Sequence, residues 1–233
     1  MVAEQKQIRV SEASTELGIA ISTAHRLLAM LEHHDFVVQD PESKVYKAGP
    51  VLLRIGLVAA KNYDIRSVIH PFAESLRDET GETVHVAVLQ GNEMLFIDCL
   101  ESPNALRVAS RVGTRMWAHC TSIGKAWLAF ESEDFLRGLF PSTRLPALTP
   151  HSITSRAALF AELGEIRKRW YAHNENESEM GVGSVSSAVL NQLGRPVAAM
   201  SVSVPLARMP DERWEILAEA VKRACRSVES TIP

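Results

Sequence analysis

The chain has 233 residues, of which 46% are hydrophobic and 23% are charged, and its formal net charge is −3. This balance is typical of a globular protein and excludes a disordered or collagen-like chain. It gives no electrostatic indication of a nucleic-acid partner, because the first sixty residues contain six basic and seven acidic side chains.

Composition also argues against several kinds of site and location. Basic residues interrupt the apolar runs well short of the ~20 residues that a membrane-spanning helix needs. The segment MVAEQKQIRV lacks the apolar stretch of a signal peptide. Cys99, Cys120 and Cys225 form no C-x-x-C pair, which argues against a disulfide framework and a structural zinc site. We therefore expect a cytoplasmic protein with no membrane partner and no bound metal.

The first fifty residues have the pattern of a helix, a turn, a second helix and a hairpin. In VSEASTELG, Ser11 is a candidate N-cap and Gly18 is placed to end the helix. The next helix is expected from Ser22, in STAHRLLAMLEHH. Its predicted buried stripe consists of Ala24, Leu27, Leu28 and Leu31. Residues 36–38 and 45–47 alternate as short strands around DPES. This order predicts a winged helix-turn-helix, which binds DNA.

The segment GIAISTAHRLLAMLEHHDFVVQDPESKVYKAGPVLLRIG closely resembles the DNA-binding domain of the IclR family of bacterial regulators. The family usually has G-L-P-K-S-T followed by A-H-R-L-L. The residues that match are Ser22, Thr23, His25 and Arg26. Ala20 and Ile21 stand where proline and lysine are common. The resemblance implies that the matching residues contact DNA together with Lys44 and Lys47 of the wing, although a packing or capping role for His25 stays an equal alternative.

The family domain opens with a further helix of a dozen or more residues, where this chain has only MVAEQKQI. Two explanations stay open: the true start lies upstream, or the first helix is truncated and the domain is less stable than its relatives. Farther along, PVLLRIGLVAAKNYD has apolar residues at helical spacing, which predicts a linker helix. We expect a DNA-binding domain at 1–50, the linker helix at 51–65 and a second domain at 66–233.

The second domain mixes helices with hairpins. Helices are expected at residues 65–80, 122–130, 155–171 and 211–230. Strands are expected on both sides of a Gly-Asn turn at 91–92, and at 106–110, 182–190 and 196–204. These elements predict an α+β fold with an antiparallel sheet flanked by helices. HCTSIGKAWLAF and SEMGVGSVSSAVLNQLGRPVAAMSVSVP also match the IclR family, which implies a GAF-like effector domain and a homodimer or homotetramer.

The resemblance also implies an effector pocket lined from four stretches of this domain. The residues in those positions are Ser122, Ile123, Asn174, Ser184, Ser201 and Ser203. Hydroxyl and backbone donors suit a carboxylate or a carbonyl oxygen. Trp117 stands where the family often has proline, and as an apolar wall it favours an aromatic or otherwise bulky acid. An ordinary core position for Trp117 and a solvated face for the serines stay open as alternatives.

The sequence therefore predicts a transcriptional repressor that binds operator DNA and is controlled by a small organic acid. Two alternatives stay open: a ligand-binding protein with a degenerate DNA-binding domain, and an enzyme of unknown reaction. We expect no catalytic residues and no cofactor. The chain has no H-E-x-x-H and no G-x-S-x-G, and SIGKA lacks the flanking Gly and Ser/Thr of a nucleotide phosphate loop.

Overall fold

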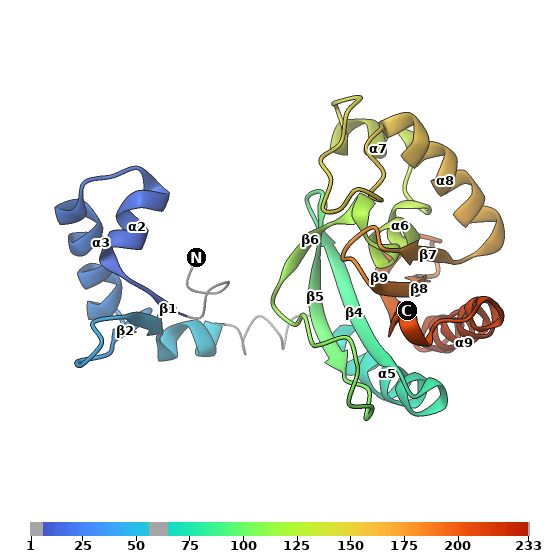
Figure 1. Ribbon diagram of the computed structural model, residues 1–233, viewed down its shortest axis with the longest axis horizontal. Coiled ribbons are helices and arrows are strands. Elements are labelled where there is room, and N and C mark those ends of the chain that lie inside the picture. Colours follow the sequence, from blue (N-terminus) through green and yellow to red (C-terminus); the bar gives the residue numbers. More distant parts are fainter. Residues whose placement is uncertain (1–6, 56–64, 233) are drawn as a thin grey trace. The chain divides into compact units, whose positions relative to one another are not determined.

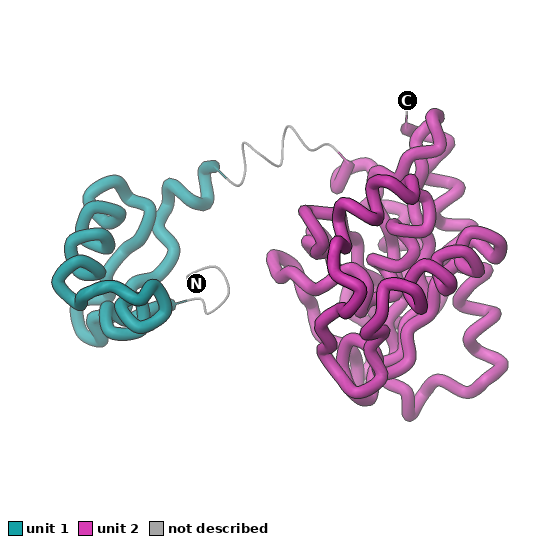
Figure 2. The backbone as a smooth tube through the Cα atoms, turned by 90° about the horizontal axis from the view of Figure 1, so that it is seen from above, with its two compact units in different colours: residues 1–64 teal, residues 65–233 magenta. Residues whose placement is uncertain are grey.

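The computed structural model describes residues 7–55 and 65–232. The chain divides into two compact units, Met1–Asp64 (unit 1) and Ile65–Pro233 (unit 2), which are coloured separately in Figure 2. Among the described residues, no helix combines the length and the apolar character that crossing a bilayer requires.

Unit 1 is a helix-turn-helix followed by a hairpin. Helix α2 (Val10–Leu17) ends at Gly18, whose φ of 63° is the left-handed conformation that favours glycine. Helix α3 (Ile21–His33) follows after a short turn. Strands β2 (Val37–Gln39) and β3 (Tyr46–Ala48) form the hairpin, and β1 (Gln7–Ile8) pairs antiparallel with the other side of β3. The predicted winged helix-turn-helix is confirmed.

The helix starts of unit 1 differ from the predicted ones. Helix α2 begins before Ser11, and the N–H of its N-cap residue Arg9 donates to the Glu12 carboxylate at 2.7 Å. Helix α3 has Ala20 at the N-cap and no side-chain cap, so the sequence pattern, which offers Ser22 or Thr23 as a cap, does not describe how this helix begins. At the start of α3, the backbone carbonyl of Ala20 accepts the N–H groups of both Thr23 and Ala24, so these two donors need no side-chain cap.

The core of unit 1 is small. Among the described residues, the buried members of its core cluster are Ile8, Ala13, Ala24, Leu28, Val37 and Tyr46. The predicted stripe on α3 is therefore only half right: Ala24 and Leu28 are buried, whereas Leu27 and Leu31 are 37% and 39% exposed. Among the described residues, α2 and β2 pack against α3, and Leu27 and Leu31 lie on a flank that these elements leave partly exposed.

Both ends of unit 1 are described only in part. In the stretch MVAEQKQI, where the family has a helix, Gln7 and Ile8 form β1, and residues 1–6 lie outside the described residues. In the predicted linker helix, residues 50–55 are helical, and residues 56–64 lie outside the described residues.

Unit 2 is a six-stranded antiparallel sheet with helices on both faces (Figure 1). In spatial order the strands are β6 (Arg115–Trp117), β5 (Glu93–Leu100), β4 (Thr83–Gln90), β9 (Pro196–Pro205), β8 (Val182–Leu190) and β7 (Ala172–Glu175). The helices of one face are α5 (Ile65–Thr80) and α9 (Asp211–Glu229). The helices of the other face are α6 (Ser122–Leu128), α7 (Glu133–Leu139) and α8 (Arg156–Arg169).

The alternation of side chains along β9 shows why the two faces differ. Met200, Val202 and Val204 point to the face covered by α5 and α9 and belong to its apolar core. Ser201 and Ser203 point to the opposite face, toward α6, because successive side chains of a strand alternate. One strand thus contributes both to a dry core and to a polar surface beneath α6.

Four elements of unit 2 differ from the prediction: one expected strand is absent among the described residues, and two strands and one helix were not predicted. The predicted strand at 106–110 is a loop that crosses the end of the sheet, where the Thr83 hydroxyl donates to the Val108 carbonyl at 2.7 Å. The sixth strand position is taken instead by β6, which pairs with β5. Helix α7 and strand β7, seven and four residues long, were not predicted.

Candidate functional site

Polar side chains form two rows across the α6 face of the unit 2 sheet. In the first row, consecutive register partners on β7, β8, β9 and β4 are Asn174, Ser184, Ser203 and Thr83. In the second row, partners on β8, β9 and β4 are Ser186, Ser201 and His85. Register partners point to the same face of a sheet. The strands therefore place side chains from distant parts of the chain beside one another.

Four members of these rows, His85, Ser184, Ser201 and Ser203, form the floor of a small cavity under the start of α6. Five of the predicted effector residues line it: Ser122, Ile123, Ser184, Ser201 and Ser203. The cavity leaves about 20 Å³ for the centre of a water-sized sphere, which is room for about one water molecule. Its walls are close together in this structure, and its polar groups converge on one point.

The other two predicted effector residues lie elsewhere. Asn174 is fully buried next to the cavity floor, but its amide donates to the Cys120 carbonyl at 3.0 Å and its carbonyl oxygen accepts the Glu177 N–H at 3.0 Å. Trp117 ends β6 and stacks on the His119 ring, with centroids 6.0 Å apart. Neither lines the cavity, so a direct contact with an effector stays a prediction for both.

A chain of hydroxyls connects the sheet to α6. The Ser186 hydroxyl donates to Ser122 Oγ at 2.6 Å, and the Ser122 and Ser184 hydroxyls are 2.7 Å apart. In the second contact either hydroxyl can be the donor. When Ser122 donates to Ser184, the proton of Ser184 is left for an acceptor in the cavity. Such a chain is polarised along its length, which strengthens its last donor.

Helix α6 can approach the sheet this closely because of two residues at its start. The Thr121 side chain caps the helix by accepting the Gly124 N–H at 3.1 Å. A Cβ on Gly124 would lie 2.2 Å from the Ala118 carbonyl oxygen, so glycine is required there. These contacts fix Ser122 over the polar rows.

His85 is a cavity residue that the sequence reasoning missed. Burial, followed by the charge of nearby Arg111, lowers the pKa of this imidazole from 6.5 to about 4, so it is neutral at physiological pH. Its Nε2 lies 3.3 Å from the Ala109 carbonyl, and its Nδ1 lies 3.4 Å from Ser203 Oγ. With the proton on Nε2, Nδ1 accepts from Ser203 and orients that hydroxyl.

Arg111, also missed, gives the cavity a positively charged wall. It comes from the loop between β5 and β6, and its side chain is 18% exposed. One terminal nitrogen of its guanidinium lies 2.5 Å from a carboxylate oxygen of Glu179, in the loop between β7 and β8. Another lies 2.7 Å from the sulfur of Met116, which lines the same cavity.

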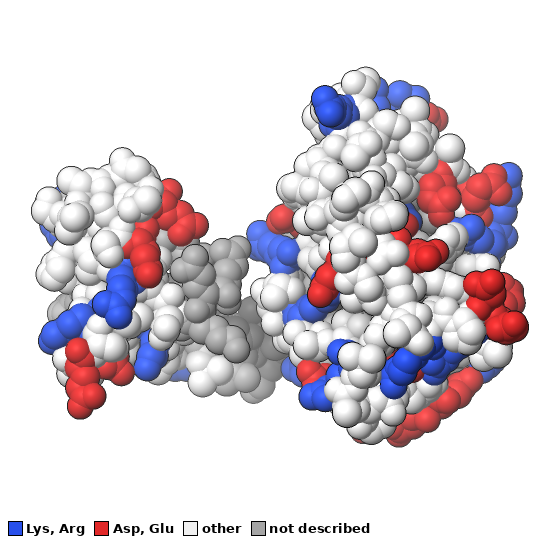
Figure 3. Space-filling view, viewed as in Figure 1, with Lys and Arg blue, Asp and Glu red and all other residues white. Residues whose placement is uncertain are grey.

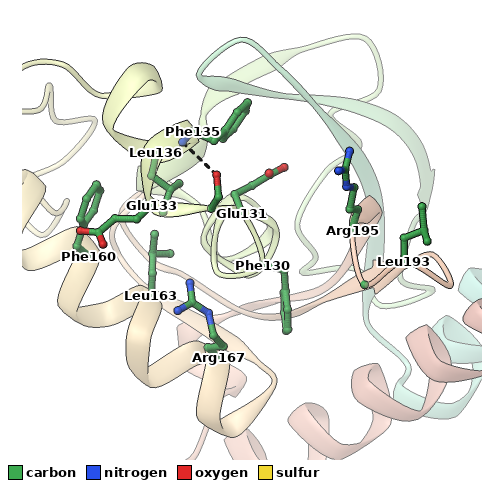
Figure 4. Close-up of a pocket in the computed structure, with 12 residues that line it drawn as sticks. Phe130, Glu131, Glu133, Phe135, Leu136, Phe160, Leu163, Arg167, Leu193 and Arg195 are labelled. Carbon is green, nitrogen blue, oxygen red and sulfur yellow. Dashed lines mark hydrogen bonds between the residues drawn. The ribbon is translucent and has the colours of Figure 1, made fainter.

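Unit 2 also has a larger and more open groove, of about 930 Å³, between α7, α8 and the β8–β9 turn. Figure 4 shows that its labelled side chains are spread around the groove and do not converge. Phe130, Phe135 and Phe160 contribute apolar surface, while Arg167 and Arg195 carry charges. Because an effector needs a few convergent polar groups, the smaller cavity is the better candidate site.

The predicted DNA-binding residues of unit 1 lie on α3 and on the β2–β3 hairpin. Ser22, His25 and Arg26 are exposed, and Thr23 is half-buried. The wing lysines Lys44 and Lys47 are both exposed. On the face seen in Figure 3, basic and acidic side chains of this unit lie side by side. Any affinity for DNA therefore depends on shape and on individual contacts more than on a general positive field.

The wing is held by an acidic residue. Asp40 accepts the N–H groups of Ser43 and Glu42 at 2.9 and 3.2 Å, and its other oxygen lies 3.3 Å from Lys47 Nζ. The Ser43 backbone bond, with the other donors, lowers the pKa of Asp40 to about 2. Asp40 therefore stabilises the turn and at the same time offsets part of the charge of the wing.

Comparison with known proteins decides what this combination is. Residues 57–230 match the model "Bacterial transcriptional regulator IclR C-terminal", and residues 1–41 match the "IclR helix-turn-helix domain". The chain belongs to the IclR family of bacterial transcriptional regulators. Like its relatives, it is a transcriptional regulator with a helix-turn-helix DNA-binding domain.

Two curated members of the IclR family are similar along nearly the whole chain. The HTH-type transcriptional regulator XynR of Escherichia coli is 32% identical over 94% of this chain and 86% of its own length. The HTH-type transcriptional repressor AllR of the same species is 31% identical over 96% of this chain and 82% of its own. A crystal structure of an IclR regulator from Alicyclobacillus acidocaldarius has a TM-score of 0.85 and 27% identity, covering 98% of this chain and 93% of the other.

In this IclR-family chain, the sequence reasoning found one half of the cavity. The predicted residues come from the α6 turn, β8 and β9, where the family motifs lie. The lining residues that it missed are His85 on β4, Phe96 on β5, Arg111 in the loop before β6, and Thr121, Ser178 and Val182. His85 carried a signal, a lone titratable side chain within the apolar strand TVHVAV. Arg111 carried none, because a basic residue in a polar loop is ordinary.

Proposed function

We propose that this regulator is a repressor, and that a small organic carboxylate bound in the unit 2 cavity controls its affinity for operator DNA. The observation that supports the proposal is the convergence of Ser122, Ser184, Ser201 and Ser203 with a positively charged wall at Arg111. Hydroxyl donors and one guanidinium suit an anion of about one unit charge. The neutral state of the neighbouring imidazole adds no second charge.

We further propose that the acid is aromatic or otherwise bulky. The cavity lining includes Phe96 and Met116, which offer an apolar side to a ring, while the serines bind the carboxylate. Asn174, beside the cavity, connects the turn before α6 to the β7–β8 loop through its two hydrogen bonds, and Trp117 follows the lining residue Met116 on β6. A ring needs more room than one water molecule, so its binding requires a wall to move.

On the DNA side, α3 is the helix that enters the major groove. We propose that Ser22, Thr23 and Arg26 contact the DNA, with His25 beside them and the wing lysines Lys44 and Lys47 on phosphates. A homodimer or homotetramer would present two such units to a roughly palindromic operator. A bacterial regulator that binds chromosomal DNA would act in the cytoplasm.

Fluorescence anisotropy on a labelled fragment from upstream of the gene tests the proposal. Wild type should bind, weaken with added salt, and change affinity on adding benzoate-sized acids. Arg26→Ala should weaken binding by roughly 10-fold or more if it reads a base, and Lys44→Ala should mainly reduce the salt dependence. Ser201→Ala with Ser203→Ala should bind DNA like wild type but lose the response to acid.

Two alternatives give different results in the same assay. A ligand-binding protein with a degenerate DNA-binding domain is favoured by the pairing of Lys47 with Asp40, and it would show acid binding without salt-dependent DNA binding. An enzyme would convert the bound acid, which product analysis by mass spectrometry detects. Response to pyruvate-sized acids alone would contradict the aromatic class.

A further inference from the structure

Arg111 separates two hollows of unit 2. It lines the small inner cavity, and it also lines an outer groove of about 440 Å³ formed by the loop at 106–111 and the residues around Gly181. Val182 is shared in the same way. The two hollows are therefore neighbours, and the Arg111 side chain with its partner Glu179 forms the wall between them.

The loop that carries Glu179 is fixed at both ends and open at its tip. At one end, Glu177 forms a buried ion pair with Lys125 at 2.6 Å, and its carbonyl accepts the Ser152 hydroxyl at 2.6 Å. At the other end, the Gly181 N–H donates to the side chain of Asn176 at 2.7 Å. Between these anchors lie residues 178–180, of which residues 179 and 180 are exposed.

The Arg111 side is likewise held by its backbone, and the contacts of its guanidinium, among the described residues, are with the side chains of Glu179 and Met116. The Arg111 carbonyl accepts the Thr114 N–H at 2.9 Å and the Thr114 hydroxyl at 2.6 Å. The Glu101 carboxylate fixes the preceding residue by accepting the Ser110 N–H at 2.9 Å. The wall can therefore open by rotation of two side chains, without unfolding either loop.

We propose that Arg111 binds the carboxylate of the effector, and that this carboxylate replaces Glu179 as its partner and opens the wall between cavity and groove. This inference rests on the proposed acid effector. The exchange keeps the guanidinium paired with one carboxylate before and after binding. It releases Glu179, already 59% exposed, to water. A neutral amide of the same shape offers no such replacement, so the wall selects acids by charge.

Joining the two hollows would also provide the room that an aromatic acid needs. The inner cavity alone holds about one water molecule, whereas the outer groove adds about 440 Å³. With its carboxylate between Arg111 and the Ser184 hydroxyl, a ring can extend into the space that the wall had closed. A surface ion pair with no such role would leave the binding of a ligand unchanged.

Binding of benzoate and of benzamide to the full-length protein, measured by calorimetry, tests the charge selection. Glu179→Gln should bind benzoate roughly 10-fold more tightly, because the competing carboxylate is gone. Arg111→Met should lose roughly 10-fold to 100-fold for benzoate and little for benzamide, and Arg111→Lys should recover part of the loss. The matched controls Arg115→Met and Glu175→Gln, which alter exposed charges outside both hollows, should leave both ligands unchanged.

A second measurement tests the wall without any effector. Ser184 lies inside the cavity and is 7% exposed, so a Ser184→Cys side chain should react slowly with iodoacetamide in the wild-type background. Adding Glu179→Gln should raise the alkylation rate at position 184 several-fold, as read by peptide mass spectrometry. Cys225, which is completely buried, serves as the internal control for global opening.

The outcomes separate the wall from the proposed function. Benzoate that binds equally to wild type, Arg111→Met and Glu179→Gln overturns the inference and leaves an acid-responsive regulator standing. Faster alkylation in Glu179→Gln, with no benzoate binding by any variant, supports the wall but overturns Arg111 as a carboxylate ligand and the proposed effector class. Unchanged alkylation together with unchanged binding overturns both parts of the inference.

Discussion

Unit 1 and unit 2 are stabilised in different ways. Among the described residues, the core cluster of unit 1 has six buried apolar side chains, whereas unit 2 has two clusters, of 18 and 17. Unit 1 leaves Leu17, Ile21 and Met30 more than half exposed. Stability of a small domain depends on how much apolar surface it removes from water, so unit 1 has little to spare.

The two units also treat charge differently. The ion pair of the unit 1 wing, between Lys47 and Asp40, lies at the surface. Unit 2 buries the carboxylates of Glu82 and Asp98 and the ammonium of Lys125, each with a partner. Only a large core can offset the desolvation of such groups. The extensive apolar core of unit 2 therefore stabilises a fold that contains a buried polar cavity.

The largest expected effect is that of Gly124→Ala in unit 2. The new Cβ would lie 2.2 Å from the Ala118 carbonyl oxygen, and the other nearest atoms are also backbone. Overpacking usually costs 1–3 kcal/mol, and a clash with backbone should exceed about 3 kcal/mol. All four tryptophans lie in unit 2, so urea unfolding followed by tryptophan fluorescence isolates this unit.

Gly164→Ala is the matched control, because the Cβ at this α8 position would meet nothing within 4 Å. It should stabilise unit 2 by about 0.5–1 kcal/mol, since alanine favours a helix. Equal destabilisation by both substitutions would show that the close approach of α6 to the sheet is not a determinant of stability.

Lys125→Met should be the next most severe substitution. It leaves the carboxylate of Glu177 buried without a partner, and breaking such a pair costs about 3 kcal/mol. Adding Glu177→Leu should recover most of the loss, again read from tryptophan fluorescence in urea. Lys168→Met, which breaks an exposed pair with Glu165, should change stability by less than about 0.5 kcal/mol.

His85 should make the stability of unit 2 depend on pH. The unfolded imidazole has a pKa near 6.5 and the folded one a pKa near 4, so the unfolded state binds a proton first as the pH falls. Stability present above pH 6.5 is therefore lost between pH 6.5 and about 4, by roughly 2 kcal/mol at pH 5. His85→Gln should flatten this difference, and the exposed His151→Gln should not.

The smallest expected effect concerns the wing of unit 1. Asp40→Asn keeps the oxygen that accepts from Ser43 but removes the charge that pairs with Lys47. The affinity for operator DNA should rise roughly two- to fivefold at low salt and less at high salt. Glu165→Gln makes the same change in net charge far along the sequence. An equal gain from it would attribute the effect to total charge.

Local sequence patterns predicted most of the helices and strands. The strands that were missed depend on contacts between segments far apart in the sequence. The hairpin around Gly91 and the long helices were predicted because their periodicity or turn residues lie within one short segment. The prediction of a strand at 106–110 was wrong because this segment is a loop, in which the Val108 carbonyl accepts a side-chain hydroxyl, that of Thr83. The pairing of β1 with β3 joins residues some forty positions apart, which no local pattern shows.

The candidate site was predictable only where a family motif marked it. Ser184, Ser201 and Ser203 were chosen through the resemblance, and the register of β8 and β9 places them on one face. His85 reaches the cavity because β4 pairs with β9, and Arg111 reaches it from the loop between β5 and β6. Both depend on tertiary structure, which no local pattern shows. Exposure on α3 was also mispredicted at Leu27, since helical spacing shows a face but not what covers it.

How closely the cavity is sealed affects the timing of a response as well as its strength. If the proposed wall of Arg111 and Glu179 closes a space with room for about one water molecule, a larger ligand would enter only during the fraction of time that the wall is open. Association would then fall below the encounter rate, and release would wait for the same event. A short pulse of effector would therefore end before much of the regulator had bound it. After a sustained supply, the bound effector would dissociate slowly, so the change in DNA affinity would outlast the supply.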